Sequence, residues 1–122
     1  MEKPNYKELL ASGVHFGHLK KKWNPKMSPY IFAERKGIHL IDLNRTSECL
    51  ERAGQAARQM AKAGKKILFV ATKKQAREIV ATAAKSVNMP YVTDRWLGGM
   101  MTNFATIRRS VRKMQNIEGM LN

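Results

Sequence analysis

Cysteine and acidic residues are scarce in this sequence. Cys49 is the single cysteine, which excludes an internal disulfide and fits a reducing compartment. Nine Asp and Glu residues stand against 23 Lys and Arg residues, and their spacing offers no pair of carboxylates for acid–base catalysis. The net charge of +14 is larger than solubility requires. It predicts a polyanionic partner, with nucleic acid as the first candidate and an anionic membrane as the second.

Long apolar runs and targeting segments are also missing. No run approaches the roughly 20 apolar residues of a membrane-spanning helix, and no secretory or transit signal opens the chain. We therefore expect a cytoplasmic protein with no membrane partner. A chain of 122 residues, 43% of them hydrophobic, is long enough for one small folded domain with a modest core.

The glycine patterns of nucleotide-binding enzymes are absent as well. The apolar run 67–71 is followed by Thr72 and two lysines, without a glycine. The glycine pair at 98–99 is not followed by the Lys-Ser or Lys-Thr of a phosphate-binding loop. His15 and His18 are too few to form a metal site by themselves. We therefore expect no catalysis, no cofactor, no bound metal and no small-molecule substrate.

Apolar patterning predicts an alternating α/β order from residue 30 onwards. Strands are expected over 30–33 and 38–43, around a turn at 35–37, and again over 67–71 and 91–93. The run 67–71 is continuously apolar, which is typical of a parallel strand buried on both faces. Strands that alternate with helices indicate βαβ units, so we predict a parallel α/β sheet of the doubly wound type.

Two helices are expected between these strands. The first is predicted to begin after an N-cap at Thr46 and to end at Gly64. Its apolar face has small side chains, which suggests close packing against a sheet, and consists of Leu50, Ala53, Ala57 and Met60. The second helix, over 75–85, is expected to bury a stripe that consists of Ala76, Ile79, Val80 and Ala83.

The two ends of the chain do not continue the alternation of strands and helices. A short helix is expected over 6–13, followed by an irregular basic arm over 14–29, because its prolines and lack of period argue against a helix or central strand. The last helix carries apolar residues near heptad spacing between arginines, and such a seam requires a partner helix. The residues of the seam are Phe104, Ile107, Val111, Met114 and Leu121.

The stretch 94–103 places an arginine, a tryptophan and a glycine pair directly before this basic helix. Glycines allow positive φ or close approach of the main chain to a ligand, and a helix N-terminus favours anions. Basic groups bind phosphates and aromatic rings stack on unpaired bases. Each tryptophan could instead belong to the core, and the lysines after residue 72 could form a merely solvated loop. The predicted nucleic-acid contacts are Lys20, Lys21, Lys22, Trp23, Lys26, Lys73, Lys74, Arg95, Trp96, Gly98, Gly99, Asn103, Arg108, Arg109 and Arg112.

Four ordered blocks resemble the bacterial family of small-subunit ribosomal protein S2. Residues 9–18, LLASGVHFGH, are similar to the N-terminal signature of that family, and residues 23–32 are similar to its next block. Residues 67–73 resemble its central strand, and residues 95–103, RWLGGMMTN, resemble its most recognisable motif. The blocks extend over nearly the whole chain.

The resemblance implies a Rossmann-like, flavodoxin-like α/β domain with an inserted helical hairpin. It also implies a structural role in the small ribosomal subunit, with small-subunit ribosomal RNA and ribosomal protein S1, which recruits messenger RNA, as partners. Mapped by motif, residues 1–29 are the N-terminal helix and basic arm, and residues 30–102 are the N-terminal part of the α/β domain. Residues 103–122 are the first arm of the coiled-coil hairpin, so we expect the N-terminal portion of a longer protein.

Two other classes of function stay open. The first is a nucleotide-dependent enzyme on the same fold, which nucleotide titration would reveal. The second is a DNA-binding or translation-factor-like module, which competition between duplex DNA and structured ribosomal RNA would distinguish from a ribosomal protein.

Overall fold

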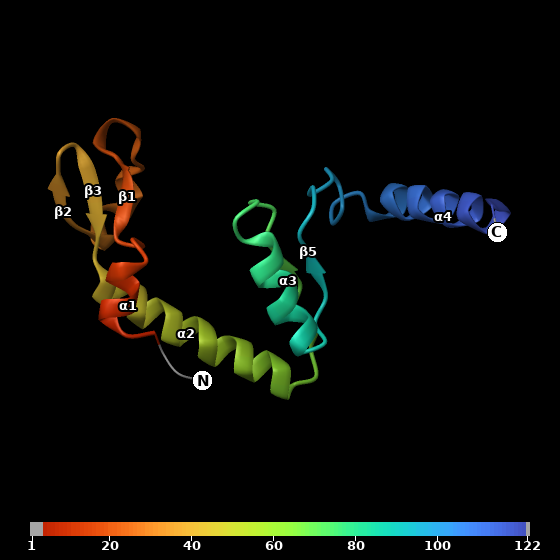
Figure 1. The fold of residues 1–122 in the computed structure, drawn as a ribbon, viewed down its shortest axis with the longest axis horizontal. Helices are drawn as coiled ribbons and strands as arrows, with labels where there is room; N and C mark the ends of the chain where they lie inside the picture. Colours follow the sequence, from red (N-terminus) through yellow and green to blue (C-terminus); the bar gives the residue numbers. More distant parts are fainter. Residues whose placement is uncertain (1–3, 122) are drawn as a thin grey trace. The chain divides into compact units, whose positions relative to one another are not determined.

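The computed structural model describes residues 4–121, which form two compact units (Figure 1). One unit extends to Lys65 and the other begins at Lys66. The expectation of a single domain with one core is therefore wrong. Small units bury little surface, and among the described residues only Leu43, His39 and Ala84 are buried.

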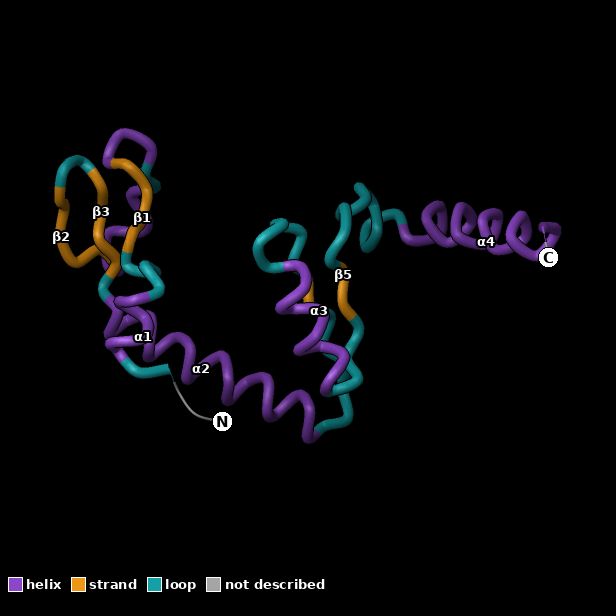
Figure 2. The backbone as a smooth tube through the Cα atoms, viewed as in Figure 1, coloured by secondary structure: helices purple, strands orange, loops and turns teal. Residues whose placement is uncertain are grey.

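The first unit combines helices with a three-stranded antiparallel sheet (Figure 2). β3 is the central strand, flanked by β1 and β2. The predicted parallel sheet does not describe this unit, because strands joined by a two-residue turn can only be antiparallel. Its elements, with η for a 3-10 helix, are α1 (Tyr6–Ala11), β1 (Phe16–Leu19), η1 (Lys20–Lys22), η2 (Pro25–Tyr30), β2 (Ile31–Arg35), β3 (Ile38–Ile41) and α2 (Leu43–Lys62).

The predicted hairpin between β2 and β3 is confirmed. Lys36 and Gly37 form its turn, and both have positive φ, of 51° and 75°. Two successive residues with positive φ are typical of the type I′ turn, whose twist matches that of the flanking strands.

The segment 14–29 is more regular than predicted, because it contains β1 and the two 3-10 helices. β1 is held against β3 as an edge strand, and the Ile41 amide donates to the His15 carbonyl at 2.7 Å. A four-residue strand that contains a glycine is too short for alternation to reveal it. The arm is thus less irregular than expected, although, as predicted, it contains neither an α-helix nor a central strand.

α2 begins about one turn earlier than predicted. Asp42, and not Thr46, is its N-cap, since the Asp42 Oδ1 accepts a hydrogen bond from the Asn44 amide at 2.9 Å. Both residue types are good caps, but Asp42 directly precedes Leu43, whose burial fixes where the helix begins. The predicted end is confirmed by Gly64, which has a φ of 69°. The predicted apolar face of α2 is exposed, from Leu50 to Met60, and does not pack against a sheet in this unit.

Replacing Leu43 with alanine is expected to lower the free energy of unfolding of the first unit by about 2–5 kcal/mol. The side chain is only 2% exposed, so its loss leaves a cavity at the start of α2. Leu50, on the same helix but 44% exposed, is the matched control and should cost less than about 1 kcal/mol when changed to alanine. Urea denaturation followed by circular dichroism measures both changes, and equal losses would contradict this description of the core.

The second unit contains β4 (Phe69–Val70), α3 (Arg77–Ser86), β5 (Tyr91–Val92) and α4 (Phe104–Leu121). β4 and β5 are parallel, with Phe69 opposite Tyr91, and α3 connects them. The predicted βαβ unit is therefore present. The fold of the chain as a whole is mixed α/β, with one antiparallel sheet and one parallel pair of strands.

Two details of this βαβ unit differ from prediction. β4 has two residues, Phe69 and Val70, and both are exposed rather than buried on two faces. A two-stranded sheet with one crossover helix can be covered by that helix on one face only. On α3, Ile79 is 72% exposed, whereas Ala84 is buried and Val80 half-buried. The buried stripe of α3 thus lies one residue further along the helix than predicted.

Candidate nucleic-acid interface

The carboxyl ends of β4 and β5 lie at the same edge of their sheet, because the two strands are parallel. Lys73 and Lys74 follow β4, and Arg95 and Trp96 follow β5. The three cations are exposed, and Trp96 is half-buried. Open α/β sheets bind ligands at this edge. Four of the predicted residues thus follow the strand ends at one edge of this sheet, a place that suits a ligand.

Arg77 links the two segments that follow these strands, and sequence reasoning did not single it out. Its Nε donates to the Thr72 carbonyl at 3.2 Å, and its Nη1 lies 3.9 Å from the Asp94 Oδ1. An ion pair this exposed contributes little stability, but it brings the Arg77 side chain into contact with both segments. Because the link is tertiary, no local pattern could have revealed it.

The segment between β5 and α4 is a hydrogen-bonded turn around Gly99. The Asn103 amide donates to the Gly99 carbonyl at 2.8 Å, and the Met100 amide donates to the Leu97 carbonyl at 3.3 Å. Gly99 has a φ of 85°, which is one of the two alternatives that the sequence left open for this pair, and a Cβ on it would lie 2.9 Å from the Asn103 Cβ. Gly98 has no positive φ, and a Cβ there would meet nothing within 4 Å. The backbone requirement for glycine therefore holds only for Gly99.

α4 carries its cations as two like-charge pairs. Arg108 and Arg112 are four residues apart, and so are Arg109 and Lys113. Like charges at this spacing destabilise a helix by about 0.2–0.5 kcal/mol per pair. All four side chains are exposed, and within residues 4–121 no carboxylate forms an ion pair with them. A bound polyanion would relieve this repulsion.

The apolar seam beside these cations is open in the described structure. Phe104 is 57% exposed and Leu121 is 82% exposed, and only Ile107 in the seam is half-buried. The predicted terminal helix is confirmed, and its seam retains the capacity to pack against a partner helix.

In the first unit, the predicted lysines lie in and beside η1. Lys20, Lys21 and Lys22 form this 3-10 helix, Lys26 lies in η2, and all four are exposed. The Lys20 Nζ lies 2.8 Å from the Glu34 Oε2, so one of the four charges is partly neutralised. The other three remain available to an anion.

Trp23 packs within the first unit. Its ring meets the His39 ring edge-on, with the ring centroids 4.4 Å apart, and the side chain is half-buried. Since His39 is buried in the central strand, this contact holds the lysine run against the sheet. Stacking of Trp23 on an RNA base stays a prediction, as does every other RNA contact named above.

The predicted residues are thus divided between the two units. Those in the first unit are Lys20, Lys21, Lys22, Trp23 and Lys26. Those in the second unit are Lys73, Lys74, Arg95, Trp96, Gly98, Gly99, Asn103, Arg108, Arg109 and Arg112.

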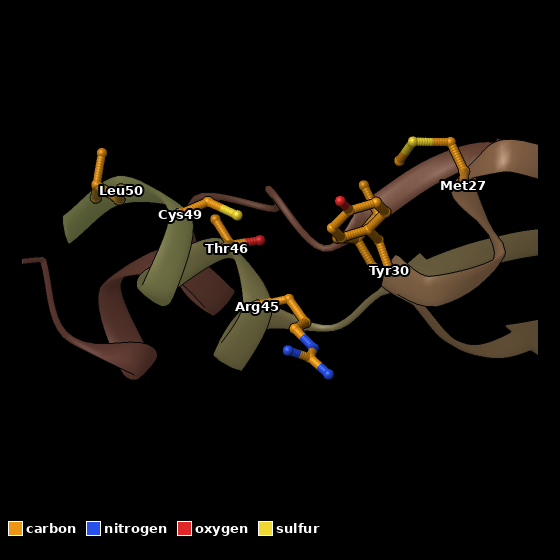
Figure 3. A pocket seen from close by; sticks show the side chains of 7 residues that line it. Met27, Tyr30, Arg45, Thr46, Cys49 and Leu50 are labelled. Atoms are coloured by element: carbon orange, nitrogen blue, oxygen red, sulfur yellow. The ribbon is translucent and has the colours of Figure 1, made fainter. Parts of the chain in front are cut away.

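The first unit also has a largely apolar groove of about 420 Å³ beside the start of α2 (Figure 3). The residues that line it are Met27, Tyr30, Ile41, Arg45, Thr46, Cys49 and Leu50. The Arg45 Nη1 lies 3.3 Å from the Glu48 Oε2. The lining contains no imidazole or carboxylate that could activate the Cys49 thiol, as a nucleophile requires. We assign no catalytic role to this groove.

The histidines contribute to packing. His15 lies against Phe16, with ring centroids 4.2 Å apart, and His39 lies against Trp23. Within residues 4–121, no three His, Cys, Asp or Glu side chains gather in a way that could hold a metal ion. None of the described helices combines the length and apolarity of a membrane-crossing segment.

Comparison with known proteins identifies the family. A family model described as "Ribosomal protein S2" matches residues 9–122. The chain belongs to the ribosomal protein S2 family. It is 60% identical over 120 residues to "Small ribosomal subunit protein uS2" of Cytophaga hutchinsonii. It is 59% identical over 122 residues to the protein of that name from Bacteroides thetaiotaomicron, and 59% identical over 114 residues to that from Flavobacterium johnsoniae.

These S2 relatives are longer than the chain. The alignments cover 98%, 100% and 93% of the chain, but only 47%, 44% and 45% of the three relatives, in the same order. The chain therefore spans about half the length of the curated relatives it matches. The resemblance stated from the four sequence blocks is confirmed.

Proposed function

We propose that this chain is a structural, non-catalytic constituent of the small ribosomal subunit, which it joins by binding the phosphates of small-subunit ribosomal RNA. The observation that carries the proposal is the set of exposed cations in η1, at the β4–β5 edge and on α4. Cations of this kind supply most of the affinity for a nucleic acid and orient the protein on it. The proposal places the chain on the ribosome, in the cytoplasm.

The β4–α3–β5 unit supports a finer description of the complete protein. A single βαβ unit with exposed Phe69 and Val70 is suited to further parallel strands and a second layer of helices. In this proposal the complete protein forms a Rossmann-like, flavodoxin-like sheet around it. α4 is then the first arm of a helical hairpin, whose return arm covers the exposed seam.

Docking of ribosomal protein S1, and through it recruitment of messenger RNA, is the second part of the proposed function. Family membership supports it. Small subunits reconstituted with the chain should retain more S1 than subunits assembled without it. Equal retention would remove this part of the proposal and leave RNA binding untouched.

The direct test of the role as a subunit constituent is sedimentation with ribosomal subunits. The tagged chain should sediment with small subunits that lack their own S2 protein, and not with large subunits. Equal association with both subunits would contradict a specific structural role and would indicate non-specific attraction to RNA.

A nucleotide-dependent enzyme is the alternative, and Lys73 and Lys74 at the β4–β5 edge are the observation that favours it. However, the Ala76 and Arg77 amides both donate to the Lys73 carbonyl, at 2.9 and 3.2 Å. These two amides at the start of α3 are therefore bonded within the loop and do not face a ligand. Titration with a nucleoside triphosphate should show no saturable binding.

A further inference from the structure

The tip of the β2–β3 hairpin gathers five cations from three different elements. Ile38, in the central strand, pairs with Leu19 at the end of β1 and with Arg35 at the end of β2. Figure 1 shows the end of β1 and the β2–β3 turn at the same end of this sheet. The cations that emerge here are Lys20, Lys21, Lys22, Arg35 and Lys36; we call them the tip cluster.

The tip cluster is held together by the backbone. The Lys20 amide donates to the Gly37 carbonyl at 2.9 Å, which fixes the start of η1 against the turn. Neighbouring strands lie about 5 Å apart, so three strands place the two sides of the cluster about 10 Å from each other. Glu34 pairs with Lys20 at 2.8 Å. Among the described residues, no carboxylate forms an ion pair with the other four cations.

The turn itself carries a cation where the backbone favours another residue. Lys36 has a φ of 51° at the first position of a type I′-like turn, where asparagine or glycine is normally preferred. A lysine in this conformation costs about 1 kcal/mol or more. Unfavourable backbone positions that are kept in a fold point to a functional demand on the side chain. Lys36 supplies a positive charge at the apex of the hairpin.

We propose that the tip cluster is one phosphate-binding site for duplex RNA. This inference rests on the proposed function and goes beyond it, because it joins Arg35 and Lys36 to the lysine run and specifies the kind of RNA. The major groove of A-form RNA is deep and narrow, so proteins contact the phosphates along its edges rather than its bases. A narrow hairpin with cations on both sides of its tip can contact the phosphates of both strands at once. Binding at this site is sensitive to charge and shape and insensitive to base sequence.

The test compares two variants of the full chain with equal net charge. The tip variant carries Lys21→Gln, Lys22→Gln, Arg35→Gln and Lys36→Asn, the last chosen because asparagine suits the turn. The matched control carries Arg52→Gln, Arg58→Gln, Lys62→Gln and Lys65→Gln, all at exposed positions of or next to α2.

Affinity for a hairpin duplex from small-subunit ribosomal RNA is measured as a function of salt. The tip variant should reduce the log–log salt slope by about 3, since each lost phosphate contact removes roughly 0.7–0.9. The control should bind like the parent within about threefold.

The outcomes separate this inference from the proposed function. If the parent binds the duplex and both variants weaken binding equally, the tip site is wrong while RNA binding stands. If the parent does not bind small-subunit RNA at all, the proposed function fails, and this site fails with it. If a single-stranded RNA of the same sequence depends on the tip as strongly as the duplex does, the assignment to duplex RNA is wrong.

A second measurement needs no variant and so does not depend on variant folding. Amine acetylation of the parent chain, read by mass spectrometry, should fall severalfold at Lys21, Lys22 and Lys36 when the duplex is added. Lys62 and Lys65, on the control surface, should keep their reactivity. Protection that is equal at both sets of lysines, or absent at the tip, would overturn the proposal.

Discussion

Replacing Gly99 with alanine is expected to open the turn before α4, whereas the same replacement at Gly98 is expected to be tolerated. Gly99 has a φ of 85°, which costs an L-residue roughly 1–2 kcal/mol. Its new Cβ would also lie 2.9 Å from the Asn103 Cβ, so the start of α4 would have to shift. Gly98 has open space around it and no such conformation.

Amide hydrogen exchange at Asn103 measures the opening of this turn, because the Asn103 amide donates to the Gly99 carbonyl. Exchange should accelerate by about 5–30-fold in the Gly99→Ala protein, which corresponds to 1–2 kcal/mol. The Gly98→Ala protein is the matched control and should exchange like the parent. Similar exchange in both variants would mean that the turn does not depend on a glycine at position 99.

Removing three arginines from α4 is expected to weaken RNA binding and to strengthen the helix at the same time. The variant carries Arg108→Gln, Arg109→Gln and Arg112→Gln, and glutamine retains helix propensity. Three lost phosphate contacts reduce the salt slope by about 2–3 and the affinity at 0.1 M salt on the order of 100-fold. The helix gains because both like-charge pairs are removed, each of which costs about 0.2–0.5 kcal/mol.

The opposite signs of these two effects distinguish binding residues from folding residues. Circular dichroism measures the helix content and melting of the variant, and fluorescence anisotropy measures its RNA affinity. The matched control, Arg52→Gln with Arg58→Gln and Lys62→Gln on α2, removes the same charge from another exposed helix. A control that loses as much affinity as the α4 variant would show that net charge alone, and not the α4 surface, determines binding.

Local signals in the sequence were sufficient for several elements. Gly37 after Lys36 marked the hairpin turn, because few other residues accept positive φ there. Gly64 marked the end of α2, and Gly99 marked the turn before α4, for the same reason. The apolar stretches around Phe69 and Tyr91, separated by a helical segment, were sufficient to predict a parallel pair.

Features that depend on tertiary packing could not be predicted. The choice of Asp42 over Thr46 as N-cap followed from the burial of Leu43, which no local pattern shows. The exposure of Val70 and Ile79 depends on which elements cover them. The short edge strand β1 acquires its hydrogen bonds only from β3.

The candidate interface likewise combines features that local signals predict with features that depend on tertiary packing. The individual cations could be named from their clustering along the chain, whereas their grouping in space required the register of the sheets. Arg35 joins the lysine run only because Ile38 pairs with both outer strands. The Arg77 side chain contacts the segments after β4 and β5 at Thr72 and Asp94, which lie 5 and 17 positions away along the chain.

The central claim is that phosphate contacts bind this chain to small-subunit ribosomal RNA, and the salt dependence of that binding tests it most directly. The equilibrium constant for small-subunit ribosomal RNA should be measured between 50 and 200 mM salt. With six to ten phosphates contacted, affinity should fall by about 10³–10⁵ over this range. An affinity that barely changes with salt would contradict the account, since binding would then rest on something other than the exposed cations of η1, the β4–β5 edge and α4.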